Sequence, residues 1–398
     1  MFPVPFIRVF FLLTVLLVGA NLFVYGQSTV PPLFDVYTSN EIWKKLELNK
    51  IGKAQAAQEL AVIGKYKDAQ LLLGYENLLE LKNQNINELS FSDLLNAADS
   101  RIVIINESHH MPNHRRFLFN QLKILYEAGY RYLALETLTN AFDDSLALRL
   151  DMELLERGFP LFSQYTGIYS REPEYGNLIR KAIELGFEII AYERTTRGGD
   201  REFIQAQNIY NKTFGIDETS MVVVFCGYHH VFDNSNGKRK MMAEYLRELS
   251  GHAPLTFYQL NAFNKSLESK FCQPSPLILS NDELLVFYDS IDITNRVDYF
   301  VYHFNPIFYY GIPDWKFDGQ KFEIFDITEF FGDDAKNLVF PIIGKIFFAN
   351  ERTIATPVEI FEWSNTSMPA FVVLNQGVRY RVQLRDKKDK EIEIFLDW

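Results

Sequence analysis

Residues 102–117, IVIINESHHMPNHRRF, decide the interpretation of the whole sequence. The stretch opens with a run of aliphatic residues and closes with a glutamate, three histidines and two arginines. An unbroken apolar run of this length is typical of a strand that is buried on both faces, as in a parallel sheet. We therefore expect a core strand that carries a polar cluster to the edge of a sheet.

The same pattern recurs between residues 100 and 250, where short apolar runs alternate with longer amphipathic segments. Such alternation favours an α/β fold in which a mainly parallel sheet is flanked by helices. The expected strands are RIVIIN (101–106), YRYLALE (130–136), FEIIAYE (187–193) and MVVVFCG (221–227), and the expected helices cover about 114–129, 143–157, 174–186, 201–214 and 238–250. The expected helix ends coincide with Gly129, Gly158, Gly186 and Gly251, and glycine adopts a left-handed cap at the least cost.

The rest of the chain differs from this α/β pattern. Residues 38–95 have Leu, Ala and Ile at helical spacing and no proline, which predicts a small helical region. The last part of the chain alternates apolar and polar residues between polar turns, which predicts strands. We therefore expect an N-terminal helical region at 27–97, an α/β domain at 98–316 and a small β-rich, sandwich-like domain at 317–398.

The first 26 residues resemble a secretory signal peptide, with Arg8 ahead of a long apolar run and small residues before a cut in front of Gln27. The alternative is an uncleaved membrane anchor, because the run is close to spanning length. We expect an exported protein that is periplasmic, outer-membrane-associated or secreted.

Charge and cysteine content limit the partners. The chain has 40 basic and 51 acidic residues and a formal charge of −11, which argues against binding to nucleic acid or anionic lipid. Its two cysteines, Cys226 and Cys272, are too few for a disulfide scaffold, although one bridge is possible. Cys226 lies in an apolar run and is expected to be a small buried hydrophobe.

Polar residues follow each of the four expected strands, and the carboxyl ends of such strands form the ligand-binding edge of a sheet or barrel. Five of the seven histidines lie in just two of these places, which favours a functional site. The candidates are Glu107, His109, His110 and His114 around the first strand end, Glu136 after the second, Glu193 and Arg194 after the third, and His229 and His230 after the fourth.

Two kinds of chemistry fit these residues. A histidine held by a carboxylate can activate water, and Arg116, Arg194 or a protonated histidine can stabilise the oxyanion that forms. The same histidines and carboxylates could instead hold a catalytic divalent metal. The spacing matches no standard zinc motif, so the residues alone leave both possibilities open.

At the level of motifs, NESHHMPNHRRF, FEIIAYE, DREFIQAQNIYNK and VVFCGYHHVFD resemble the superfamily that joins erythromycin esterase-type hydrolases, ChaN-type haem-binding proteins and TIKI/TraB proteases. The resemblance covers about residues 98–316. It matches Glu107 to the glutamate of a turn in which the family usually has glycine directly before that glutamate; in this sequence the preceding residue is Asn106. It leaves open whether His109 or His110 is the functional histidine. It also matches Glu136, Glu193, Arg201 and His230 to family positions.

The resemblance implies three functions. The esterase-like one is an extracytoplasmic hydrolase of an ester or lactone, with His110 or His109 as general base, His230 and Arg194 at the oxyanion, and no required cofactor. The ChaN-like one is a haem or iron-porphyrin binding protein, with His229 as a cofactor-binding candidate and FYYGIPDW (308–315) lining a pocket. The third is a metal-dependent peptidase. The expected partner is a small-molecule substrate or haem, and any contact with a membrane is expected only through an uncleaved N-terminal segment.

Overall fold

The apolar run that opens the sequence argument forms β2 (Ile102–Glu107), and all six of its residues are buried. β2 lies in the middle of a seven-stranded sheet in the described part of the chain, with the order β4-β3-β5-β2-β6-β10-β7. Every neighbouring pair is parallel except β10 with β7. The mixed α/β class and the mainly parallel sheet are therefore confirmed. The other strands are β3 (Tyr132–Leu135), β4 (Glu188–Ala191), β5 (Val222–Gly227), β6 (Leu255–Leu260), β7 (Leu277–Ser280) and β10 (Tyr299–Tyr302).

This computed structural model describes residues 33–83, 86–140, 153–194, 198–271, 275–317, 322–331, 337–365 and 367–397. The expected signal peptide and Cys272 lie outside the described residues, and so does most of the helix expected at 143–157. Within the described residues, no helix is both long enough and apolar enough to cross a membrane.

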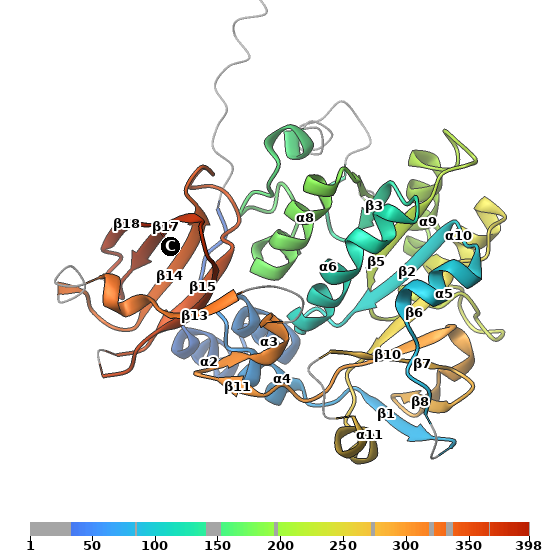
Figure 1. Cartoon of the computed structure of the whole chain (residues 1–398), viewed down its shortest axis with the longest axis horizontal. Helices are drawn as coiled ribbons and strands as arrows, with labels where there is room; N and C mark the ends of the chain where they lie inside the picture. The colour runs from blue at the N-terminus through green and yellow to red at the C-terminus, as the bar shows by residue number, and fades with distance from the viewer. Residues whose placement is uncertain are drawn as a thin grey trace, which may run out of the picture. The chain divides into compact units, whose positions relative to one another are not determined.

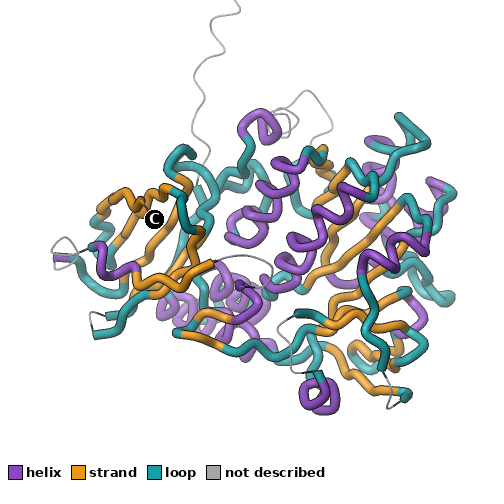
Figure 2. The backbone as a smooth tube through the Cα atoms, viewed as in Figure 1, coloured by secondary structure: helices purple, strands orange, loops and turns teal. Residues whose placement is uncertain are grey.

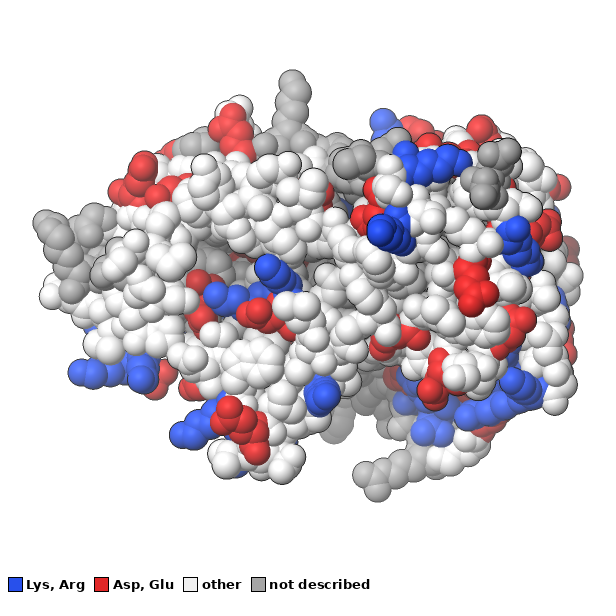
Figure 3. All heavy atoms as spheres, turned by 90° about the horizontal axis from the view of Figure 1, so that it is seen from below, with Lys and Arg blue, Asp and Glu red and all other residues white. Residues whose placement is uncertain are grey.

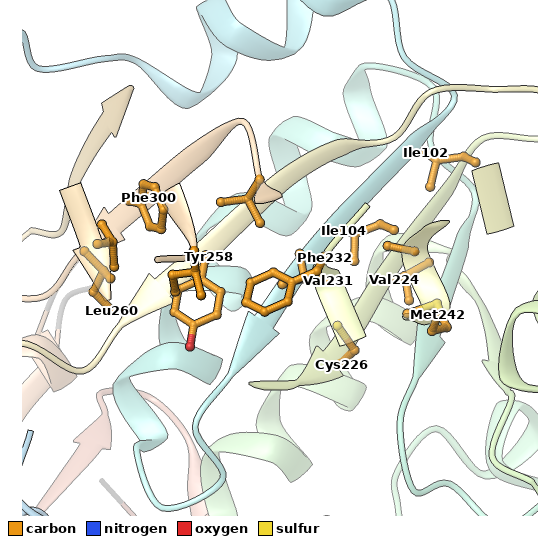
Figure 4. Close-up of a cluster of buried hydrophobic side chains, with 14 of the residues drawn as sticks. Ile102, Ile104, Val224, Cys226, Val231, Phe232, Met242, Tyr258, Leu260 and Phe300 are labelled. Carbon is orange, nitrogen blue, oxygen red and sulfur yellow. The ribbon is translucent and has the colours of Figure 1, made fainter. Parts of the chain in front are cut away.

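Alternate residues of the strands face two separate apolar cores. Ile102 and Ile104 pack with α9 and α10, and Figure 4 shows this cluster with Val224, Cys226 and Met242. Val103 and Ile105 pack with α5, α6 and α8 on the opposite face. Figure 1 shows α6 and α8 on one side of the sheet and α9 and α10 on the other. The bounds are α5 (Phe91–Ala98), α6 (Pro112–Glu127), α8 (Pro173–Leu185), α9 (Arg201–Lys212) and α10 (Met242–Ser250).

The helix ends follow local chemistry. α6 and α8 each begin with a proline, whose fixed φ and missing N–H suit the first helical position. The side chain of Asp200 caps α9 by accepting from the Glu202 N–H. All four glycines expected at helix ends have positive φ, as expected: Gly129 (103°), Gly158 (80°), Gly186 (97°) and Gly251 (72°).

The region at 38–95 is helical over α2 (Ser39–Glu47), α3 (Lys53–Val62) and α4 (Tyr66–Leu73), but one segment differs. Residues 77–81, NLLEL, form β1 (Asn77–Leu81), which pairs antiparallel with β8 (Leu284–Tyr288). The helical prediction is wrong for this segment because its buried and exposed residues alternate, and because its partner strand is distant in sequence.

The C-terminal region is strand-rich and antiparallel, which confirms its predicted class (Figure 2). One apolar core is shared by residues of the two described sheets, such as Ile346 and Val382 in one and Val372 in the other. The four-stranded sheet has the order β15-β14-β17-β18, and β13 pairs with β16. The bounds are β13 (Phe322–Asp326), β14 (Ile342–Phe348), β15 (Glu359–Trp363), β16 (Phe371–Asn375), β17 (Arg379–Arg385) and β18 (Glu391–Asp397).

Cys226 is buried within β5, with its sulfur 3.8 Å from the Ile105 carbonyl oxygen, as expected for a small core residue. At the surface, basic and acidic side chains are interspersed on the face seen in Figure 3.

A buried ionic network joins four segments that are distant from one another in sequence. Lys316 is 3% exposed and pairs with Glu359 of β15, and its Nζ lies 3.5 Å from Oε1 of Glu174 in α8. Arg116 of α6 approaches the other oxygen of Glu174 at 3.6 Å and donates to the Lys316 carbonyl oxygen at 2.7 Å. Because buried charges need partners, this network fixes how the segments pack.

The first prediction concerns this network. Lys316→Met should lower the free energy of unfolding by about 3–5 kcal/mol, because it leaves the buried Glu359 carboxylate without its cation. The matched control is Lys123→Met, whose exposed pair with Glu127 spans 3.7 Å and should contribute less than about 1 kcal/mol. Urea denaturation of both variants measures the difference. Equal effects of the two substitutions would contradict the network's role.

Candidate functional site

The carboxyl ends of β2, β3, β4 and β5 bring the candidate residues to one edge of the sheet. Glu107 is the last residue of β2, Glu136 directly follows β3, and Glu193 comes two residues after β4. β5 ends at Gly227, and the 3-10 turn Tyr228–Val231 that follows carries His230. Parallel strands meet this edge with the same polarity, so residues far apart in sequence become neighbours.

His109 and Glu107 form the first histidine–carboxylate pair. His109 Nδ1 lies 2.8 Å from Glu107 Oε1. Burial opposes ionisation of Glu107, but the charge of Arg115 and its hydrogen bonds outweigh burial and lower the pKa of Glu107 to about 2. An ionised carboxylate only accepts hydrogen bonds, so His109 donates through Nδ1. Nε2 is then the basic atom of the ring.

Arg115 holds Glu107 in place from the first turn of α6. Its Nε donates to Glu107 Oε2 at 2.6 Å, its Nη2 to Glu107 Oε1 at 3.0 Å, and its Nη1 to Glu172 Oε2 at 2.8 Å. All three side chains are at most 4% exposed, so the guanidinium contacts both carboxylates away from solvent.

The His109 ring is packed between aromatic neighbours and a glycine. Its centroid lies 4.2 Å from that of Tyr169 and 4.8 Å from that of Tyr228. A Cβ at Gly227 would lie 2.6 Å from His109 Nε2 and 2.8 Å from Glu136 Oε2. His109 Nε2 and Glu136 Oε2 therefore both lie around the position that a Cβ of residue 227 would occupy. Glycine is required at 227 because a side chain there would clash with both. Tyr228 has a φ of 45°, a left-handed conformation that costs a non-glycine residue about 1–3 kcal/mol.

His230 and Glu202 form the second pair. His230 Nδ1 lies 2.6 Å from Glu202 Oε2, while Nε2 lies 3.4 Å from Glu136 Oε1 and 3.0 Å from Arg201 Nη1. Burial favours the neutral ring, but Glu202 and Glu136 together raise the pKa of His230 above its usual value. The neutral ring accepts from Arg201, and the protonated ring faces Glu136. His230 thus has a partner in either protonation state.

Arg201, the first residue of α9, connects the remaining carboxylates. Its Nη2 donates to Glu136 Oε1 at 2.8 Å and to Glu193 Oε2 at 2.6 Å, and its Nε donates to Glu193 Oε1 at 3.0 Å. Although burial acts in the other direction, these bonds lower the pKa of Glu193. Gln205 also donates to Glu193 Oε2, at 3.1 Å.

The structure therefore brings together five of the residues that the sequence singled out, and it places four elsewhere. Glu107, His109, Glu136, Glu193 and His230 share the edge. Arg194 was expected beside His230, but it donates to the carbonyl oxygens of Gly198 and Gly199 at 3.3 and 3.2 Å. The arginine that lies next to His230 is Arg201.

The other three histidines pack away from this edge. His110 is 1% exposed and borders a small pocket with Tyr66 and His303, and neither of its ring nitrogens has a hydrogen-bond partner among the described residues. His114 accepts from the Ser108 N–H at 3.0 Å and stacks on His303 at 4.6 Å between centroids. These two histidines therefore belong to the packing of the α6 start.

His229 turns the opposite way from its neighbour His230. Its ring stacks on Phe232 at 4.8 Å between centroids and meets the ring of Tyr288 edge-on at 4.3 Å. Burial lowers its pKa to about 4, so the ring is neutral at physiological pH. Haem binding through His229 stays a prediction from the resemblance.

The residues at the edge do not fit a divalent metal. Within the described ranges, no group of three or more His, Cys, Asp or Glu side chains is arranged to hold one. In addition, the carboxylates that would ligate a cation are already paired, Glu107 with Arg115 and both Glu136 and Glu193 with Arg201. A metal would have to displace these guanidinium groups.

Sequence reasoning missed Glu172 and Glu202 as partners and did not anticipate how Asn106 is used. Glu202 could have been found from its place beside Arg201 at a helix start, whereas Glu172 has no local sequence motif. The resemblance matches Asn106 to a position in a turn where the family usually has glycine. Instead, Asn106 lies within β2, without a positive φ, and its side chain donates to the Tyr228 carbonyl oxygen at 3.0 Å and accepts from the Gln259 N–H.

The second prediction is the pH dependence of stability at His230. Because the folded pKa is raised, the stabilisation from its protonated ring is fully present below the usual histidine pKa of about 6.5 and is lost as pH rises through the folded value. The stability difference between the wild type and His230→Gln should therefore shrink from pH 6 to pH 9 in urea denaturation.

The variant Glu202→Gln is the matched control, because it removes the hydrogen-bonded carboxylate that raises this pKa. In its background, the pH-dependent part of the His230→Gln effect should be smaller. A difference that stays constant over this pH range in the wild-type background would contradict the assignment.

Comparison with known proteins gives limited information. No family model matches the chain, and no curated protein matches it. Similar solved structures include the type III effector HopBA1, at 11% identity and a TM-score of 0.33, over 56% of this chain and 99% of that one. RRSP, a MARTX toxin effector domain from Vibrio vulnificus CMCP6, has 17% identity and a TM-score of 0.28, over 52% and 39% of the chains. A chain from a crystal structure of bacterial protein toxins has 13% identity and a TM-score of 0.29, over 63% and 47%. At these TM-scores the likeness carries no argument about function.

Proposed function

We propose that the protein is a hydrolase of ester or lactone bonds that activates water with His109. The observation that supports this function is the pair of histidine–carboxylate units, His109–Glu107 and His230–Glu202, that face Glu136 from two sides. Acid–base hydrolysis needs a general base and a general acid. In this proposal His109 offers the basic nitrogen, and His230 favours its protonated form. We place this hydrolase outside the cytoplasm on the basis of the N-terminal segment alone.

His109 is the general base in this proposal. Its Nε2 removes a proton from water, and the resulting hydroxide attacks the carbonyl carbon. Glu107 holds the Nδ1 proton, which keeps Nε2 basic and stabilises the imidazolium once it forms. Arg115 and Glu172 are positioning residues, because they hold Glu107 without facing the reacting atoms.

His230 supplies the proton donor. In its protonated form it stabilises the tetrahedral oxyanion, and a proton is then delivered to the leaving alkoxide as the carbon–oxygen bond breaks. The products are a carboxylic acid and an alcohol, so water is the one co-reactant. Arg201 pairs with both Glu136 and Glu193, which limits repulsion between these carboxylates and the developing negative charge.

Glu136 lies between the two histidines. One of its oxygens accepts from the Gly227 N–H, and the other faces Arg201 and His230. This arrangement fixes the carboxylate on both sides, and it places a hydrogen-bond acceptor next to the point where His109 Nε2 meets a water. We assign Glu136 the role of orienting that water.

The third prediction tests the base. His109→Gln should lower kcat/KM for ester hydrolysis by about 10²–10⁴-fold, the usual contribution of a general base. A panel of p-nitrophenyl esters and aliphatic lactones is the assay. His110→Gln is the matched control, since the same substitution one residue later falls on a ring outside the cluster, and it should change kcat/KM less than about threefold. Absence of turnover on the whole panel, or a larger loss in His110→Gln, would overturn the proposal.

The fourth prediction tests the packing of the base. Gly227→Ala should lower kcat at least about tenfold, because the added methyl group would lie 2.3 Å from His109 Cε1 and displace the ring. Gly52→Ala is the control, because no atom lies within 4 Å of the added group and φ is −80° there. Circular dichroism checks that both variants are folded. Full activity of Gly227→Ala would show that the ring position is unimportant.

A further inference from the structure

A cavity lies in another part of the chain than the candidate active site. Its volume is about 590 Å³, and it lies where residues 63–68, the segment 308–316 and the strands β15 and β16 meet. The residues of the candidate active site do not border it in the described part of the chain. Its size falls within the roughly 300–1,000 Å³ of small-molecule sites.

The walls of this cavity are mainly apolar and aromatic. Tyr310 and Phe371 pack against each other at 4.4 Å between centroids, and Trp363 and Phe361 border the cavity from β15. Tyr310 is 73% exposed and Met368 is 62% exposed, although both are large apolar side chains. Aromatic walls with exposed apolar residues at the rim are typical of a site that binds an apolar ligand.

The charged residues of the cavity balance one another. The inner Lys316 pairs with Glu359, and Lys65 lies 3.5 Å from Glu362. The basic residues at the cavity are Lys65, Lys67 and Lys316, and the acidic ones are Asp68, Glu359 and Glu362. Since the two signs are equal in number and the inner charges are paired, the cavity favours neither an anion nor a cation.

We propose that this cavity binds a neutral, largely apolar small molecule. The aromatic walls supply most of the contact area, and the balanced charges select against charged ligands. This inference does not depend on the proposed hydrolase function, because the cavity and the candidate active site share no residue in the described ranges.

The experiment is a fluorescence titration of the full chain with two matched probes. N-phenyl-1-naphthylamine is neutral, and 1-anilinonaphthalene-8-sulfonate has nearly the same rings with a negative charge. We expect saturable binding of the neutral probe with one site per chain, at least about tenfold tighter than that of the sulfonate. Absence of saturable binding, or tighter binding of the sulfonate, would overturn the proposal.

Variants locate the probe. Val373→Trp, which fills the cavity from β16, should weaken binding of the neutral probe at least about tenfold. Val339→Trp is the matched control, because Val339 is 36% exposed and does not border the cavity. If Val373→Trp does not fold, Ala370→Leu fills the same space with a smaller change. Unchanged binding in the folded filling variant would place the probe elsewhere and overturn the site.

Discussion

The arrangement of the sheet edge depends on the burial of Arg115 between Glu107 and Glu172. A fully buried guanidinium is stable only when its hydrogen bonds are satisfied, because desolvation of a charge costs several kcal/mol. Arg115 meets this requirement through the end of β2 and the start of α8. The same contacts keep Glu107 ionised, and an ionised Glu107 determines which nitrogen of His109 carries the proton. The two ion pairs of Arg115 thus link the packing of three elements to the chemistry of the His109 ring, which is itself only 10% exposed.

Much of this architecture could be predicted from sequence periodicity, because strands buried on both faces have continuous apolar runs and their carboxyl ends must meet at one edge. Glu107, Glu136, Glu193 and His230 follow from that rule without knowledge of the three-dimensional structure. The choice between His109 and His110 does not follow from it, because adjacent residues in a turn point in different directions and the turn geometry depends on Tyr228, Gly227 and Tyr169.

Contacts between residues that are distant in sequence explain the other differences between the sequence-based expectations and the structure. β1 is a strand because β8 pairs with it, and no property of NLLEL by itself decides between helix and strand. Arg194 and Arg201 lie near each other in sequence, but the start of α9 points Arg201 at Glu136 and Glu193, whereas Arg194 holds two carbonyl oxygens of the adjacent loop. Glu172 comes from a segment that sequence patterns did not connect with the edge at all.

The ionic network around Lys316 has a consequence for how the regions of this protein evolve. Lys316 and Glu359 lie on either side of the boundary that the sequence suggests between the α/β domain and the strand-rich region, and Glu174 lies deep within the former. A recombination event at that boundary would separate a buried cation from a carboxylate that neutralises it. The two regions are therefore expected to evolve as one unit, with compensating substitutions on both sides, rather than as modules that can be exchanged between proteins.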